Sequence, residues 1–578
     1  MIYESFIHRT NGGHSFMTIR KGLFPVTAAL LLVASGCAGQ SASAPNELPF
    51  AAGSYPVEAA AVCEVDEAGS PKPGLSRIDA PDERTVIFTL CAPDPTFLQK
   101  MTVVSYGIND SGYLASATAD GSILTTPNGT GPLKLINWSI DREEVVLGRH
   151  EGYWGEKSAS ERIIFKWQGD SAARLVQLRA GIVDGIDNVA ANDIEALSVD
   201  PAYQVMTRLP AATLYAGVNT VFEPFNDIRV RQAIAMTISS TRIVENFFPA
   251  GSATATHYVP CVITYGCEGE SWWPTDLDQA RALLAEAGFP EGFKTRIVFR
   301  DAVRVSNPDP TGIATDLQAQ LAAVGIDATL EVQEPTTFDT NVLSGLLDGI
   351  FIRGWTPDYL DPLNYMYRTL VGDYQKFGAA FESIAAPLRA ASTTPNSPQR
   401  AALFAEANNA LREAAILTPL GHGSSAVAWS SAVNDAHSSP MADENFAQVS
   451  INGREQVVFL QSVEPASLYC ADETDNNVLR ICSQINESLY AIETGGTEPI
   501  PSLATGCEPN KKLTVWTCTL REGVRFHNGA RFDAGDVRDS YAAQWDCALP
   551  THVGRSGAFR YWEFMSSFLN SDRCSTGE

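Results

Sequence analysis

Helix and strand patterns alternate along most of this chain, and the alternation constrains the fold more than any other feature. Short β-rich runs, such as residues 85–90 and 163–167, are interleaved with segments of helical period, such as 170–179 and 276–287. This alternation is typical of layered α/β proteins, in which helices cover the faces of a sheet. We therefore predict the α/β fold class.

The size and charge of the chain narrow its functional class. With 578 residues, the chain is long enough for two or three domains. Its formal net charge of −26 makes nucleic acid a poor partner, because phosphate binding needs basic patches. A basic or neutral solute suits this charge better, although acidity also serves solubility alone.

The N-terminus reads as a targeting segment. Arg20 and Lys21 precede an apolar run over 23–34, and small residues lead to Cys37. About a dozen apolar residues are too few to span a bilayer, which needs about 20. We predict a signal peptide over 1–36, with the true start at Met17, and a flexible tether over 37–74.

Cys37 stands at a cleavage point that resembles a bacterial lipoprotein box. The resemblance implies that Cys37 is lipidated and anchors the mature protein to the outer face of a membrane. The alternative is ordinary secretion with a free Cys37. Either way, the mature chain lies outside the cytoplasm.

Cysteine usage agrees with export. The sequence has 11 cysteines, and ten are left when Cys37 is set aside. An even number in an oxidising compartment favours disulfides, and no C-x-x-C pattern supports zinc. Pairing nearest neighbours gives Cys261–Cys267, Cys470–Cys482, Cys507–Cys518 and Cys547–Cys574, and leaves Cys63 and Cys91. The sequence alone does not fix this connectivity.

Motifs of common enzymes are missing from the sequence. There is no H-E-x-x-H, no Gly-Lys dipeptide for a P-loop and no G-x-S-x-G elbow. We therefore predict a protein that is not an enzyme, with no catalytic residue, no metal and no cofactor.

Six segments match a known family in order and spacing. They are residues 127–132, 173–185, 215–220, 224–233, 280–288 and 354–362. Together they resemble the extracytoplasmic solute-binding proteins of family 5, the oligopeptide-, dipeptide- and nickel-binding proteins of ABC importers. The resemblance implies a two-lobed periplasmic-binding-protein (Venus-flytrap) fold of cluster C, with an extra subdomain.

The opening motifs of that family occur at the end of this chain, in residues 458–465, 484–490 and 520–529. No motif occurs twice, which favours a circular permutation over a tandem duplication. Asn452-Gly453, a tight-turn pair between two apolar runs, joins the old end to the old beginning. We therefore expect Ile451 and Gln456 in neighbouring antiparallel strands, and residues 471–570 packed against 82–160.

The permuted order divides each lobe between distant parts of the sequence. We predict an accessory subdomain of lobe I from 75–160 plus 471–578. The lobe I core comprises 161–255 plus 426–470, and lobe II comprises 256–425.

The resemblance also implies a ligand site. A W-x-x-D segment lines the cleft in this family, and it corresponds to Trp355 and Asp358 here. Asp358 would pair with the α-ammonium of a peptide, and Trp355 would supply an apolar wall. Tyr359 lines the pocket or belongs to the core, and Asp358 has the alternative role of a helix N-cap. Nickel, haem or a sugar would leave Asp358 without this role.

The function implied is that of a monomeric substrate-binding component of an ABC importer, which passes a peptide or other small solute to permease and ATPase subunits. The lipid anchor would hold the protein at the membrane. Two alternatives remain: a solute sensor without a transport role, and an extracytoplasmic hydrolase.

Overall fold

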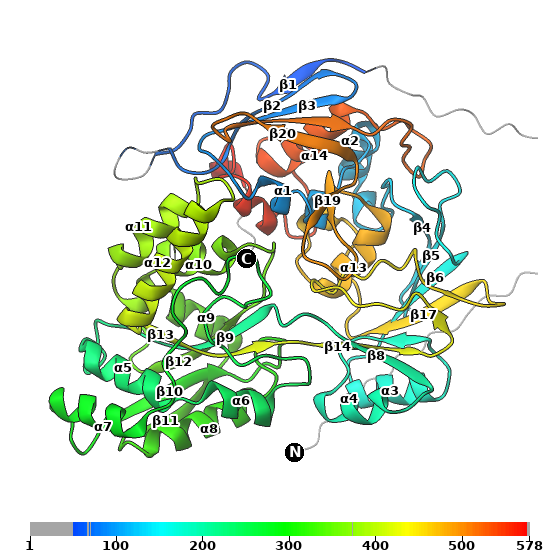
Figure 1. The fold of residues 1–578 in the computed structure, drawn as a ribbon. Helices are drawn as coiled ribbons and strands as arrows, with labels where there is room; N and C mark the ends of the chain where they lie inside the picture. Colours follow the sequence, from blue (N-terminus) through cyan, green and yellow to red (C-terminus); the bar gives the residue numbers. More distant parts are fainter. Residues whose placement is uncertain (1–49, 66–68, 70, 373, 575–578) are drawn as a thin grey trace, which may run out of the picture. The chain divides into compact units, whose positions relative to one another are not determined.

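The computed structural model describes residues 50–65, 69, 71–372 and 374–574 (Figure 1). The predicted signal peptide with Met17, the lipidation site Cys37 and the first part of the tether lie outside these residues. Among the described helices, none combines the length and the apolar character that crossing a membrane requires.

The first sheet joins the two ends of the sequence. Its strand order is β1-β2-β3-β21-β20. The strands are β1 (Gly53–Tyr55), β2 (Leu75–Asp82), β3 (Thr85–Leu90), β20 (Ala504–Pro509) and β21 (Val515–Leu520). Helix α14 (Ala534–Trp545) packs on it through Val537 and Tyr541. We call the sheet and α14 the accessory subdomain; they are drawn in blue and orange in Figure 1.

The second sheet has seven strands in the order β4-β5-β6-β17-β7-β14-β8. Its strands are β4 (Leu133–Ser139), β5 (Glu144–Arg149), β6 (Arg162–Trp167), β7 (Gly185–Ile186), β8 (Tyr203–Thr207), β14 (Ala426–Ser430) and β17 (Gln456–Gln461). Successive residues of β17 enter different cores. Phe459 packs toward α13 (Asn476–Ile485), whereas Leu460 packs toward α3 (Ser171–Arg179) and α4 (Ala191–Ser198). This alternation produces a layered α/β unit.

The third sheet has the order β11-β10-β12-β9-β13. Its strands are β9 (Ala212–Val218), β10 (Lys294–Arg300), β11 (Asp327–Gln333), β12 (Ile350–Trp355) and β13 (Leu417–Gly423). Ile350 and Ile352 of β12 face one core, and Phe351 faces the other. We call this sheet and its helices lobe II.

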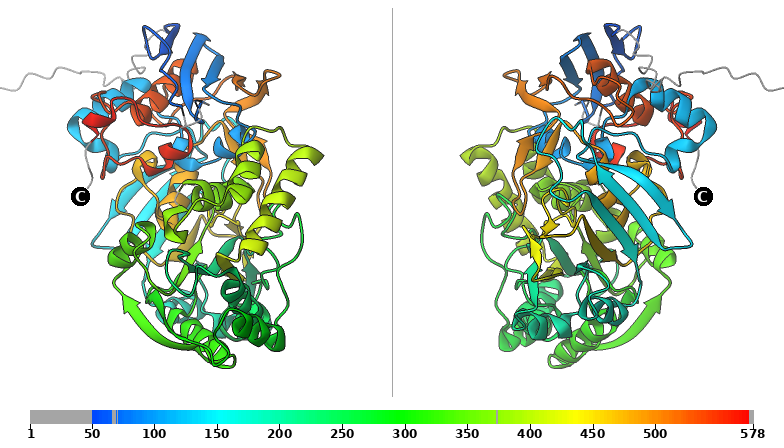
Figure 2. Two further views of the ribbon diagram at one scale, coloured as in Figure 1. Left: turned by 90° about the vertical axis from the view of Figure 1, so that its left-hand side faces the viewer. Right: turned by 90° about the vertical axis from the view of Figure 1, so that its right-hand side faces the viewer.

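Helices cover both faces of the lobe II sheet (Figures 1 and 2). One core takes side chains from α5 (Ile228–Thr237), α6 (Ser240–Phe247), α7 (Leu277–Glu286) and α8 (Pro310–Ala322). The other takes them from α9 (Pro335–Leu343), α10 (Pro362–Tyr367), α11 (Glu382–Ala391) and α12 (Pro398–Ala414). The alternation predicted from the sequence is therefore observed as an α/β/α layer arrangement.

Short elements complete the described chain. The helices are α1 (Phe97–Lys100), α2 (Ser111–Asp120), η1 (Val104–Tyr106), η2 (Ser122–Leu124), η3 (Arg368–Gly372), η4 (Tyr374–Phe377), η5 (Cys470–Asp472), η6 (Arg560–Phe564) and η7 (Ser571–Arg573). The strands are β15 (Val433–Asn434), β16 (Ser450–Ile451), β18 (Tyr490–Ile492) and β19 (Pro499–Pro501).

The strand pairings put the boundaries between the lobes at other residues than the sequence predicted. The sequence suggested that lobe I extends to residue 255, but β9 pairs with β12 and β13 in lobe II. The change of sheet lies between Thr207 and Ala212. The accessory range also stops earlier than residue 160, because β4 and β5 belong to the seven-stranded sheet. β9 is buried on both faces, so its sequence shows no alternation that would assign it to one sheet.

The late segment packs against the early one, as predicted. β21 pairs with β3 from Val515↔Thr89 to Thr519↔Thr85, and the backbone N–H of Gly131 donates to the Ile485 carbonyl at 2.8 Å.

The antiparallel hairpin predicted around Asn452-Gly453 does not form, although its turn does. The turn itself forms: Ile451 bridges Arg454, and Gly453 has a φ of 77°. However, Gln456 pairs with Arg162 in parallel, at the start of a central strand of the seven-stranded sheet. The apolar run after Gln456 is buried on both faces, which suits the interior of a sheet better than a hairpin at its edge.

Ten cysteines of the described chain form five disulfides. Four are the nearest-neighbour pairs of the sequence: Cys261–Cys267, Cys470–Cys482, Cys507–Cys518 and Cys547–Cys574. The fifth joins the two remaining cysteines, Cys63 and Cys91.

Candidate functional site

Two short segments connect lobe II to the seven-stranded sheet, and we call them the crossing segments. Residues 208–211 lead from β8 to β9, and residues 424–425 lead from β13 back to β14. They are hydrogen-bonded to each other: the Ser424 hydroxyl donates to the Arg208 carbonyl at 2.6 Å, and Arg208 Nη1 donates to Ser425 Oγ at 2.9 Å. Paired crossings of this kind are where a hinge movement between two lobes would be absorbed.

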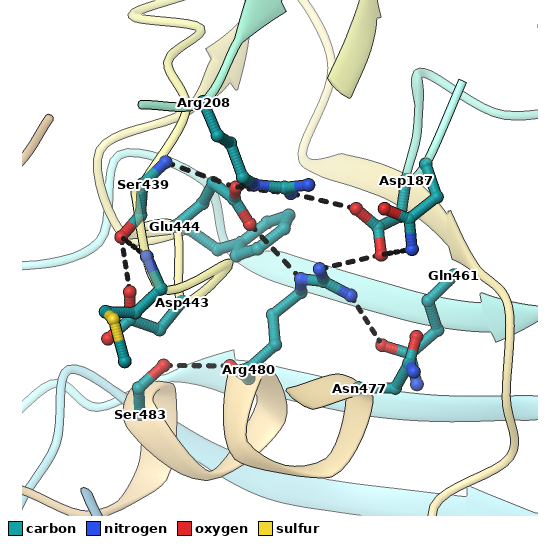
Figure 3. A network of polar contacts seen from close by, with 12 residues as sticks. Asp187, Arg208, Ser439, Asp443, Glu444, Gln461, Asn477, Arg480 and Ser483 are labelled. Atoms are coloured by element: carbon teal, nitrogen blue, oxygen red, sulfur yellow. Dashed lines mark hydrogen bonds and ion pairs between the residues drawn. The ribbon is translucent and has the colours of Figure 1, made fainter. Parts of the chain in front are cut away.

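A buried ionic network fixes the first crossing segment (Figure 3). Arg208 Nη2 lies 2.8 Å from the Asp187 carboxylate and 2.5 Å from that of Glu444. Arg480 of α13 bridges the same two acids, at 2.8 Å from Asp187 and 3.2 Å from Glu444. Each of these four side chains is at most 3% exposed, so the charges are compensated almost entirely within the network.

The network holds its acids ionised. Burial acts to raise the pKa of Asp187, but the charges of Arg480 and Arg208 outweigh burial and lower it to about 2. The same two cations hold the pKa of Glu444 below its ordinary value against the effect of burial. The network therefore anchors Arg208 to the seven-stranded sheet and to α13.

The predicted site residues lie at the end of β12, in the turn that leads to α10. Asn364 of α10 organises this turn. Its side-chain oxygen accepts from Trp355 Nε1 at 2.9 Å and from the Asp358 backbone N–H at 3.0 Å. Its side-chain nitrogen donates to Asp358 Oδ2 at 3.1 Å. One amide thus fixes both the Trp355 ring and the Asp358 carboxylate.

Asp358 is not a helix N-cap. The side chain that caps α10 is that of Asp361, which accepts from the Leu363 N–H at 3.0 Å and pairs with Arg400 at 2.8 Å. Asp358 therefore does not cap α10.

The Asp358 side chain is partly buried. Burial raises its pKa to about 6, although the hydrogen bond from Asn364 and the charge of Arg368 act to lower it. Burial also raises the pKa of Tyr106 and of Tyr561, and the Asp358 charge adds to both effects. Since Tyr106 and Tyr561 pack in or against the hydrophobic core of the accessory subdomain, the Asp358 carboxylate of lobe II lies near that core. A cation placed beside this carboxylate would be bound strongly.

Other contacts join the same turn to the accessory subdomain. Tyr359 is 8% exposed and belongs to the accessory core, where its ring meets Phe564 edge to face at 6.0 Å. Lys100 Nζ lies 5.9 Å from the Tyr359 ring centre, and Arg368 Nη1 lies 3.9 Å from Glu563 Oε2. The turn therefore belongs to the junction of the two parts.

Two cavities flank this junction. One, of about 50 Å³, lies between Leu360 and Asp361 of lobe II on one side and Gln99 of α1 and Glu498, directly before β19, on the other. The other, of about 110 Å³, lies within lobe II beside Trp355.

A larger cavity of about 490 Å³ opens on the face of β4–β6, near Ile136 and Arg142. It lies away from both crossing segments, so movement between the lobes would not close it. The junction is therefore the candidate ligand site.

The structure brings together the three residues that the sequence singled out, Trp355, Asp358 and Tyr359. Asp358 and Trp355 both form hydrogen bonds with Asn364. Tyr359 instead packs into the hydrophobic core of the accessory subdomain. Sequence reasoning missed Asn364, which lies six residues after Asp358, in the first turn of a helix that is capped by Asp361 and begins at Pro362. The spacing between Asp358 and Asn364 is the sequence signal from which the role of Asn364 could be predicted.

Two groups of side chains in the described part of the chain resemble metal sites in their spacing. His257 lies near Cys261 and Cys267, and His552 lies near Cys547 and Cys574. Both cysteine pairs are disulfides, so neither offers the thiolates that a metal would need.

Comparison with known proteins gives one family. The model described as "Bacterial extracellular solute-binding proteins, family 5 Middle" matches residues 40–377 and 498–557, more than half of the chain.

Curated relatives and a solved structure agree. "Heme-binding protein A" of Haemophilus influenzae is 28% identical over 391 residues, covering 66% of this chain and 70% of the relative. "Di/tripeptide-binding protein 1" of Pseudomonas aeruginosa is 26% identical over 388 residues, covering 65% and 71%. The structure of HbpA2 from Haemophilus parasuis matches with a TM-score of 0.59 and 27% identity, covering 67% of this chain and 76% of that one.

Proposed function

The chain belongs to the bacterial extracellular solute-binding proteins of family 5, and on that premise we propose that it captures a short peptide between lobe II and the rest of the protein and passes it to a membrane permease. The protein's task is binding, so no covalent bond is made or broken. Closure and opening about the crossing segments would take up and release the ligand.

The observation that carries the proposal is the partly buried Asp358 carboxylate at the junction, held by Asn364. A peptide has an α-ammonium group at one end, and that group would give Asp358 a charge-assisted hydrogen bond in addition to the charge of Arg368 that already acts on it. Trp355 and Tyr561, which are both partly exposed, offer apolar surface for the peptide chain. A ligand that touches both sides of the junction favours the closed form, because only that form provides both sets of contacts.

Native mass spectrometry of the purified protein tests the proposal directly. We expect co-purified masses in the range of short peptides, and peptide binding that weakens at least tenfold in Asp358→Asn. Asp327→Asn is a matched control, since that carboxylate belongs to lobe II but its side chain is 67% exposed. Haem as the co-purified ligand, visible by its absorption spectrum, would contradict the peptide proposal. So would undiminished peptide affinity of Asp358→Asn.

We further propose that Cys37 carries a lipid that tethers the protein to the membrane surface. The charged, apolar and small-residue sequence that precedes it supports this. Cys37→Ala should release the protein into the soluble fraction of exported proteins. An unmodified Cys37 in the mass spectrum of the mature protein would contradict the anchor without affecting the binding proposal.

A further inference from the structure

We propose that the cavity of about 110 Å³ beside Trp355 receives a carboxylate side chain of the bound peptide, so that this protein selects acidic peptides. The inference rests on the proposed peptide-binding function and specifies its substrate class.

The lining of this cavity is unusually rich in cations. Arg353 and Trp355 come from the end of β12, Arg368 from η3 and Lys376 from η4. Among the described residues that line the cavity, none is an aspartate or a glutamate. Three cationic side chains around one small, partly enclosed space make the local potential positive, and low-dielectric walls strengthen it.

Arg353 is the cation on which the argument depends. Its side chain is 15% exposed, and among the described residues its Nη1, shielded from solvent, has no hydrogen-bond partner. Asp339 lies 3.6 Å from Nη2, and Arg300 binds Asp339 more closely, at 2.5 Å. A buried guanidinium N–H that lacks an acceptor is costly, and a carboxylate would satisfy it.

Arg368 and Lys376 each make other interactions, so they add charge but are not the basis of the assignment. Glu563 lies 3.9 Å from Arg368, for example. Lys376 is 3% exposed and sits 5.5 Å from the Phe377 ring centre. The charge of the buried Lys376, and to a lesser degree that of the half-exposed Arg368, still raises the attraction for an anion relative to a neutral group.

The cavity adjoins the proposed ammonium site. The Arg368 guanidinium lies 6.0 Å from the Trp355 ring centre, and Trp355 is tied through Asn364 to Asp358. Its volume is below the roughly 300 Å³ of ordinary whole-ligand pockets, so it takes one group of a ligand. A peptide whose ammonium meets Asp358 would place a nearby side chain in this cavity. An acidic side chain would match the positive charge of the cavity lining.

The test compares isosteric peptides by calorimetry. The peptides Asp-Ala-Ala and Asn-Ala-Ala differ in charge but hardly in shape. We expect the wild-type protein to bind the acidic peptide at least tenfold more tightly. This preference should shrink to less than threefold in Arg353→Gln and be reduced in Lys376→Met. Lys294→Met is the matched control, because Lys294 lies in the same sheet with its side chain 89% exposed, and it should keep the full preference.

The outcomes separate the two proposals. Equal affinities for both peptides in the wild type would overturn the acidic preference and leave peptide binding intact. A preference that survives in a folded Arg353→Gln would overturn the cavity assignment. If C-terminal amidation of Asn-Ala-Ala abolishes binding in the wild type but not in Arg353→Gln, the cavity holds the terminal carboxylate, which also contradicts the inference. Binding of no peptide at all would contradict the proposed function itself.

Discussion

Arg208 Nε donates to Glu444 Oε1 at 2.8 Å, and this bond ties the segment that enters lobe II to a loop before β17. Both side chains are at most 3% exposed. The contact holds one crossing segment to the seven-stranded sheet, so movement between the lobes must occur beyond Arg208.

We expect Arg208→Met to destabilise the protein strongly. Removing one partner of a buried ion pair leaves the other charge uncompensated, and this typically costs about 3–5 kcal/mol. Here both Glu444 and Asp187 would lose a partner. Urea unfolding at pH 7 measures the effect. Arg229→Met is the control, since Arg229 pairs with Asp227 at a side chain that is 42% exposed. A loss below about 1 kcal/mol, the range of exposed pairs, would show that Arg480 alone compensates both acids.

Asp358→Asn should stabilise the ligand-free protein at pH 7. The folded-state pKa of Asp358 is about 6, whereas an unfolded aspartate has a pKa of about 3.9. The folded state therefore binds a proton between about pH 4 and pH 6, and ionisation above about pH 6 costs stability on the order of 3 kcal/mol. The neutral amide of the variant avoids that cost. Urea unfolding should show the gain at pH 7 and a much smaller one at pH 4. Equal stabilities at pH 7 would argue against desolvation of Asp358.

Peptide affinity should fall as the pH is lowered through 6. An ammonium ligand binds ionised Asp358, so affinity is complete above the free-state pKa and is lost below it, by about tenfold per pH unit. Tyr106 and Tyr561 face this carboxylate with raised pKa values, so they stay neutral between pH 5 and 7.5. Calorimetry at pH 5 and 7.5 should show about a tenfold difference in the wild type. The residual affinity of Asp358→Asn should not show it.

Local pattern was enough to predict the layers of this fold but not every boundary. The runs that became β3, β6 and β21 are short and rich in β-branched residues, so they were readable as strands. The stretch 230–248 reads as one helix because its apolar period continues. The structure breaks it at Ile238, which is extended, and begins α6 after Ser239, whose side chain accepts from the Arg242 backbone N–H.

The site was only partly predictable, for a physical reason. Trp355 and Asp358 lie in one short motif, so a resemblance finds them. The cations around the cavity come from β12, η3 and η4, and their convergence depends on how three elements pack. Nothing in the spacing of Arg353 and Lys376 encodes that convergence.

Gly129→Ala should test the contact between the early and the late parts of the chain. A Cβ at Gly129 would lie 2.0 Å from the Ile485 carbonyl at the end of α13, so the backbone must shift. We expect a loss of about 1–3 kcal/mol in unfolding free energy, as for an overpacked core. Gly506→Ala is the matched control, because nothing lies within 4 Å of its added Cβ. If both variants are equally stable, this contact is loose in solution.

The circular permutation remains a proposal, and moving the chain ends tests it. The described ends lie together: the Leu75 N–H donates to Ser566 Oγ at 3.1 Å, and the Tyr55 hydroxyl donates to Asp546. Chains tolerate new ends at exposed turns when the old ends are close, and Asn452 and Gly453 are exposed.

We therefore expect a variant that begins at Gly453 and ends at Asn452 to fold with the same peptide affinity. A Gly/Ser linker of about 15 residues, spanning about 20 Å, would join residue 574 to residue 50. Circular dichroism and calorimetry compare it with the original order. The control places the new ends inside β17, between Val458 and Phe459, where the backbone is paired on both sides and the break should prevent folding. Failure of the Gly453 variant to fold, with all five disulfides formed, would mean that the present order is required by the fold.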